Sequence, residues 1–128
     1  MIFLLDTHTF LWLHDEVEKL SVRAHDALAN PENDLYLSII SVWEIQIKLQ
    51  SKKLKISDRI DKIIDEQKRV NNLTLLPVEL IHAVNIINLP SVHKDPFDRM
   101  LISQAVVEDM TVVTADPKFS EYGVKVLW

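Results

Sequence analysis

Two acidic residues stand where predicted strands end. Asp6 follows the apolar run Ile2–Leu5, and Asp116 comes shortly after the run Thr111–Thr114. Ligands of open parallel sheets bind beyond the carboxyl ends of the strands, so two neighbouring strands would bring these carboxylates to one site. Each residue has an alternative role as a helix cap, since Asp is a favoured N-cap residue and Pro117 suits a first helical position.

Two further acids stand near the starts of predicted helices. The sequence SVWE, which ends at Glu44, matches a capping box, and Lys48 is placed to form an ion pair with Glu44. In the segment HKDPFDR, Asp95 is suited to cap a helix, Pro96 to begin it, and Asp98 to stabilise its first turn. Capping does not account for the strongly apolar neighbours of Glu44 and Asp98, so we predict that these acids begin buried helices.

Strand ends and helix starts can therefore bring four acids to one end of the fold: Asp6, Glu44, Asp98 and Asp116. Ionised carboxylates that lie close together repel each other, which raises their pKa values unless a cation neutralises them. The chain has no cysteine, and oxygen ligands alone favour Mg²⁺ or Mn²⁺, which can also bridge to substrate phosphates. Such an ion would also allow a chain with a net charge of −5 to contact anionic phosphates.

The composition excludes several other kinds of site. A single glycine, Gly123, rules out the glycine-rich loops that cradle phosphates or dinucleotides. The absence of cysteine rules out disulfides, a thiolate nucleophile and a cysteine-rich zinc site. The histidines form no HExxH pattern, so a zinc site of that type is not indicated either.

Other polar and aromatic side chains have structural roles that compete with functional ones. His8 and His93 are predicted to line the edge of the acidic site. Trp12 and Trp43 lie in apolar helical patterns, which favours core packing over stacking on nucleic-acid bases. The basic residues of segment 48–59 are predicted to form a solvated helix face.

The elements that must position these residues alternate between strands and helices. With 128 residues, of which 48% are apolar and 26% charged, the chain is expected to form one domain, residues 1–128. Helical patterns separate the apolar runs, which predicts a three-layer α/β/α sandwich around a mostly parallel sheet of four to five strands. The predicted strands are Ile2–Leu5, Leu35–Ile39, Leu73–Leu76, Thr111–Thr114 and Val124–Leu127.

The N-terminal apolar run has neither the length nor the flanks of a targeting or spanning segment. Asp6 interrupts it and no basic residue precedes it. We therefore expect a cytoplasmic protein.

The segments IFLLDTHTFLW, SVWEI, HKDPFDRMLISQA and VVTAD, in this order, resemble the four acidic motifs of the PIN-domain nucleases. The resemblance covers essentially the whole chain and is strongest to the VapC-type toxins of bacterial toxin–antitoxin systems. It implies a PIN-like fold and a metal-dependent endoribonuclease. It also implies a cognate antitoxin that binds this protein, an RNA substrate and a homodimer.

On this resemblance the acidic tetrad comprises Asp6, Glu44, Asp98 and Asp116. Asp6, Asp98 and Asp116 are expected to hold Mg²⁺ or Mn²⁺, which would activate a water for in-line attack on an RNA phosphodiester. Glu44 is expected to orient that water or hold a second ion, and the products would carry a 5′-phosphate and a 3′-hydroxyl. Auxiliary candidates are Asp95, Thr114 and Arg99. Arg99 could contact a phosphate or pair with an acid.

Two alternatives remain open on the sequence. IFLLDTHTFL also resembles the first motif of haloacid-dehalogenase-like phosphatases, although His8 replaces the second Asp of that motif and no downstream lysine motif is evident. The other alternative is a non-catalytic PIN-like binding module whose acidic pocket grips a basic partner.

Overall fold

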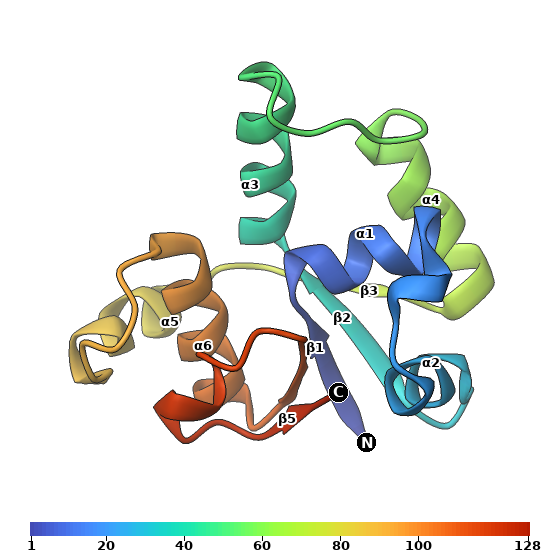
Figure 1. The fold of residues 1–128 in the computed structure, drawn as a ribbon. Coiled ribbons are helices and arrows are strands. Elements are labelled where there is room, and N and C mark those ends of the chain that lie inside the picture. Colours follow the sequence, from blue (N-terminus) through green and yellow to red (C-terminus); the bar gives the residue numbers. More distant parts are fainter.

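The strand β1 (Ile2–Leu5) lies at the centre of a five-stranded sheet with the order β3-β2-β1-β4-β5 (Figure 1). The computed structural model describes all 128 residues, and every pair of neighbouring strands is parallel. The other strands are β2 (Asp34–Ser38), β3 (Thr74–Leu76), β4 (Thr111–Val113) and β5 (Val126–Leu127). The predicted parallel sheet is confirmed, and each predicted strand coincides with an observed one to within two residues.

Helices follow the strands and cover both faces of the sheet, which confirms the predicted three layers (Figure 1). The helices are α1 (Thr7–Asp15), α2 (Val22–Ala29), α3 (Ile39–Gln50), α4 (Ile60–Asn71), α5 (Leu80–Asn85) and α6 (Pro96–Glu108). None of them combines the length with the apolar stretch that crossing a bilayer requires.

The alternation of side chains along β1 divides the core between the two faces. Phe3 and Leu5 point into the larger apolar cluster, which also contains residues of α1, α2 and α4. Leu4 points to the opposite face, where it belongs to the cluster with Leu101 and Ile102 of α6. All five side chains are almost completely buried. Close packing on both faces of β1 therefore gives Asp6, the next residue, a rigid support.

Two local predictions of helix starts are wrong. The first fails because α3 begins directly at the end of β2. Ser38 caps α3, its hydroxyl accepting a hydrogen bond from the Ile40 amide at 3.1 Å, so the capping box predicted for SVWE does not form. No regular helix follows Asp116 either. Its carboxylate accepts a hydrogen bond from the Lys118 amide at 3.0 Å in a turn.

The outer face of α3 differs from the prediction as well. Trp43 is 59% exposed and packs only edge-on against Phe97, with ring centroids 5.7 Å apart, so its assignment to the core is wrong. The helix is apolar on more sides than the core covers, since Ile39, Trp43 and Ile47 are all exposed on it. Trp12 is half-buried against the core, and the basic residues after α3 lie mostly in an exposed loop instead of on a helix.

Candidate active site

Asp6 is held at the carboxyl end of the central strand. The register pairs Leu5 with both Leu37 and Val113, so Asp6 emerges beside the last residues of β2 and β4. One carboxylate oxygen accepts a hydrogen bond from the Thr9 amide at 2.7 Å, which confirms that Asp6 caps α1, and the other accepts from the Thr114 hydroxyl. Asp6 is only 7% exposed, and burial raises its pKa although these hydrogen bonds lower it.

Glu44 lies on the second turn of α3, 5% exposed, with both carboxylate oxygens engaged. Oε1 accepts a hydrogen bond from the Thr7 hydroxyl at 2.7 Å, and Oε2 lies 2.6 Å from Lys48 Nζ, which confirms the predicted ion pair. Because Thr7 is the first residue of α1, this contact holds Glu44 beside the residue that follows Asp6.

Asp98 occupies the first turn of α6 at the edge of the same region. Asp95 caps this helix by accepting hydrogen bonds from the amides of Phe97 and Asp98, at 2.8 and 3.2 Å, as predicted. Burial raises the pKa of Asp98 to about 6, a hydrogen bond from His93 opposes this shift, and the charges of Asp95 and Glu44 add to it. Glu44 and Asp98 lie on helices that contact each other, since Trp43 of α3 packs against Phe97 of α6.

The most compact group of possible metal ligands contains a histidine. One ligand atom from each of His93, Asp98 and Asp116 lies within 4.8 Å of the other two. His93 Nε2 is 2.8 Å from Asp98 Oδ2. Asp116 is joined to Asp6 through Thr114, whose hydroxyl donates to Asp6 and accepts from the Asp116 amide at 3.0 Å.

Two residues considered for this site lie outside the compact group of possible ligands. His8 is exposed on α1, where its ring lies 5.9 Å from that of Trp12, and it is not part of the compact group. The ion pair considered for Arg99 does not form. Its guanidinium instead donates to the carbonyls of Pro90 and Ile86, at 2.9 and 3.3 Å.

Sequence reasoning placed His93 only at the edge of the site and did not identify Tyr122 at all. The motif HKDPFDR places His93 five residues before Asp98, and this spacing is the signal that could have identified it as a ligand candidate. Tyr122, 29 residues away, hydrogen-bonds to the backbone of His93. Such a contact has no counterpart in any local pattern.

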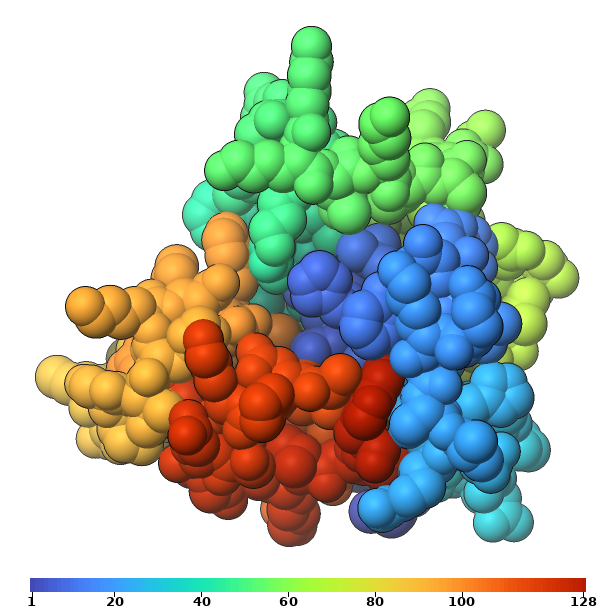
Figure 2. Space-filling view, viewed as in Figure 1, coloured from blue at the N-terminus to red at the C-terminus, as the bar shows by residue number.

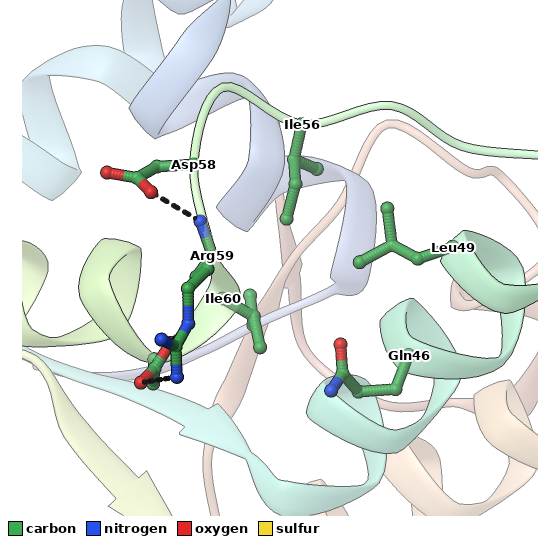
Figure 3. A pocket seen from close by; sticks show the side chains of 7 residues that line it. Gln46, Leu49, Ile56, Asp58, Arg59 and Ile60 are labelled. Carbon is green, nitrogen blue, oxygen red and sulfur yellow. Dashed lines mark hydrogen bonds and ion pairs between the residues drawn. The ribbon is translucent and has the colours of Figure 1, made fainter.

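The four candidate site acids, Asp6, Glu44, Asp98 and Asp116, do not line the largest cavity. The space-filling view has a hollow where the blue N-terminal segment, the start of α3 and the orange segment before α6 meet (Figure 2). The largest cavity, about 410 Å³, lies elsewhere, between α3 and the start of α4, and includes Leu49 and Ile60 (Figure 3). Arg59, which also lines it, pairs with Asp61 at 3.0 Å.

The fold and the site together define an α/β protein whose parallel strands lead to a group of acids and a histidine that could hold a metal ion. The chain belongs to the PIN domain family, whose model matches residues 3–125. No curated protein sequence matches it significantly.

Solved structures of toxin–antitoxin complexes share this fold. A chain of VapBC2 from Rickettsia felis, bound to a DNA fragment from their promoter, is 18% identical, with a TM-score of 0.76 and coverage of 99% of this chain and 98% of that one. DNA-bound VapBC from Salmonella typhimurium is 15% identical, with a TM-score of 0.68 and coverage of 99% and 97%. FitAcB from Neisseria gonorrhoeae is 21% identical, with a TM-score of 0.64 and coverage of 100% and 97%.

Proposed function

We propose that this protein is a metal-dependent endoribonuclease, with residues 1–128 forming one nuclease domain, and that it is the toxin of a toxin–antitoxin pair. The observation that carries the proposal is the close group of Asp98, Asp116 and His93, whose ligand atoms lie within 4.8 Å of one another, together with the Thr114 hydroxyl that joins Asp116 to the buried Asp6. Membership of the PIN domain family supports the nuclease assignment.

A divalent cation fits the side chains at this end of the sheet. Burial of Asp6 and Asp98 raises their pKa values, and no basic side chain forms a salt bridge with Asp6 or Asp116. A cation would offset the cost of keeping these carboxylates ionised. We propose that Asp6, Glu44, Asp98 and Asp116 hold Mg²⁺ or Mn²⁺. The charge of Glu44 is already neutralised in part by its ion pair with Lys48.

The metal, when bound, lowers the pKa of a coordinated water and stabilises negative charge on the phosphoryl oxygens. The chain's own residues provide the positioning. Thr9 and Thr114 fix the orientation of the Asp6 carboxylate, and Thr7 and Lys48 fix that of Glu44, which can then orient a water. Attack in line on an RNA phosphodiester would leave a 5′-phosphate and a 3′-hydroxyl.

The proposed partners follow from the structural relatives and from the surface. VapBC and FitAB neighbours are complexes of toxin–antitoxin type, so we propose a cognate antitoxin for this chain and the cytoplasm as its location. We also propose a homodimer. A surface for it is offered by four exposed apolar side chains that gather on and directly after α5: Leu80, Ile81, Val84 and Ile87.

Cleavage of total RNA by the purified protein tests the proposed activity. The assay compares Mg²⁺, Mn²⁺ and EDTA, and includes the variants Asp6→Asn and Asp98→Asn. Asp26→Asn is a matched control, because Asp26 is an acid on α2 whose side chain is 76% exposed. We expect metal-dependent cleavage by the wild type and the control, and loss of cleavage in both site variants. Equal activity in all four proteins would trace any cleavage to a contaminant and refute the proposal.

A protein that binds a basic partner but cleaves no RNA with either metal would instead support the non-catalytic binding module. The phosphatase alternative gains nothing from the structure. His8, which stands at the second acidic position of that motif, lies outside the compact group of His93, Asp98 and Asp116.

A further inference from the structure

His93 lies in the segment that leads into α6, and its backbone is held by two side chains from other parts of the fold. Tyr122 Oη accepts a hydrogen bond from the His93 amide at 2.7 Å and donates one to the His93 carbonyl at 3.0 Å. Arg99 Nη1 in turn donates to the Tyr122 hydroxyl at 3.3 Å and to the carbonyl of Pro90 at 2.9 Å. These contacts fix the direction in which the His93 side chain leaves the backbone.

The imidazole that is held in this way points at the acidic centre. Its Nε2 lies 2.8 Å from Asp98 Oδ2, and a carboxylate oxygen of Asp116 completes the group. Two adjacent ligands of one ion, each bound at the usual length, lie about 3 Å apart when they subtend a right angle at the metal. The observed separation therefore suits both a hydrogen bond in the metal-free protein and joint coordination of a metal ion.

We propose that His93 Nε2 is a direct ligand of the divalent ion, so that the site has a mixed nitrogen and oxygen donor set. The proposal rests on the metal site of the proposed function and extends it to a residue outside the acidic tetrad. Imidazole nitrogen favours transition metals over Mg²⁺, which prefers oxygen. The site should accordingly select Mn²⁺ over Mg²⁺. Coordination through Nε2 leaves the ring proton on Nδ1.

Arg99 and Tyr122 then act as positioning residues for this ligand. Arg99 directly follows Asp98 on α6, yet its guanidinium reaches back to the loop that carries His93. One helix turn thus supplies an acid of the site and a side chain that stabilises the loop with the neighbouring ligand. This arrangement explains why Arg99 forms no ion pair with an acid although acids lie close to it in the sequence.

Electron spin echo envelope modulation of protein-bound Mn²⁺ tests the proposal without reference to activity. The experiment uses the full chain as wild type, as His93→Gln and as His25→Gln, in which an exposed histidine of α2 is replaced. Isothermal titration with Mn²⁺ and with Mg²⁺ gives the affinities, and circular dichroism confirms that each variant is folded. Gln retains a polar side chain that can offer oxygen but removes the imidazole nitrogen.

We expect nitrogen modulation from a coordinated imidazole in the wild type and in His25→Gln, and its loss in His93→Gln. The Kd for Mn²⁺ should rise on the order of tenfold in His93→Gln, and the Kd for Mg²⁺ by less than about threefold. Mn²⁺ bound by the wild type without this modulation would overturn the His93 assignment and leave the nuclease proposal intact. Failure of the wild type to bind Mn²⁺ would overturn both proposals.

Discussion

The hydroxyl of Thr114 donates a hydrogen bond to the carboxylate of Asp6, although 108 residues separate the two in the sequence. The parallel pairing of β1 with β4 creates this contact by placing Asp6 next to the residue that follows Val113. The same hydroxyl accepts from the Asp116 amide at 3.0 Å. Thr114, an auxiliary candidate on the resemblance to the PIN family, therefore links two of the proposed metal ligands.

Replacing Thr114 by Val removes this link with little change in volume. The Asp6 carboxylate loses a hydrogen bond that orients it and lowers its pKa. Outer partners of metal ligands contribute strongly to affinity, so we expect the Kd for Mn²⁺, measured by isothermal titration, to rise on the order of tenfold. Thr74→Val, at an exposed position of β3, serves as the control. Equal affinities in both variants would contradict the assigned role of Thr114.

Replacing Asp98 by Asn should change how the stability of the metal-free protein depends on pH. The pKa of Asp98 is raised from 3.8 to about 6 in the folded state, so between these values the folded protein binds more protons than the unfolded one. The wild type should therefore lose stability as the pH rises from about 4 to about 6. Asp98→Asn lacks this contribution and should become progressively more stable than the wild type over that interval.

Urea denaturation across this pH range, with EDTA present, measures the difference between the two proteins. A constant offset between their unfolding free energies would be compatible with altered packing alone. The titration of Asp98 predicts a difference that changes with pH in the stated direction. Parallel curves would show that Asp98 does not titrate differently in the folded and unfolded states.

Tyr122→Phe tests whether the clamp on His93 affects the metal site. The substitution removes the one hydroxyl that hydrogen-bonds to both the amide and the carbonyl of His93. We expect a several-fold weaker affinity for Mn²⁺, and a loss of stability on the order of 1 kcal/mol because each lost hydrogen bond contributes modestly. Tyr36→Phe is a control on β2, since no side-chain hydrogen bond involves its hydroxyl. An unchanged affinity of Tyr122→Phe for Mn²⁺ would show that Tyr122 does not position His93 for metal binding.

Leu101→Ala tests the layer that supports Asp98. Leu101 is fully buried in the cluster between the sheet and α6, so truncation should leave a cavity and reduce the free energy of unfolding by about 2–5 kcal/mol. Val106→Ala provides the comparison, because Val106 lies on the same helix and is 50% exposed. Its loss should be within about 0.5 kcal/mol in the same chemical denaturation experiment. Equal losses would contradict the described core.

The sequence by itself determined the features that depend on neighbouring residues. The run before Asp6 predicts β1 to the residue, and the pair Asp95–Pro96 predicts the start of α6, since strand patterns and caps involve only a few consecutive positions. The ion pair of Glu44 with Lys48 was predictable for the same reason, because residues four apart lie on one face of a helix.

The tertiary structure alone decided which of these local features meet. Ser38 displaced Ser41 as the cap of α3 because β2 runs straight into the helix, and this point is fixed by pairing with the neighbouring strands. The place of His93 beside Asp116 depends on the path of a loop that Arg99 of the following helix and the distant Tyr122 hold together. Such contacts depend on strand register and on many weak interactions between distant residues, and no local pattern encodes them.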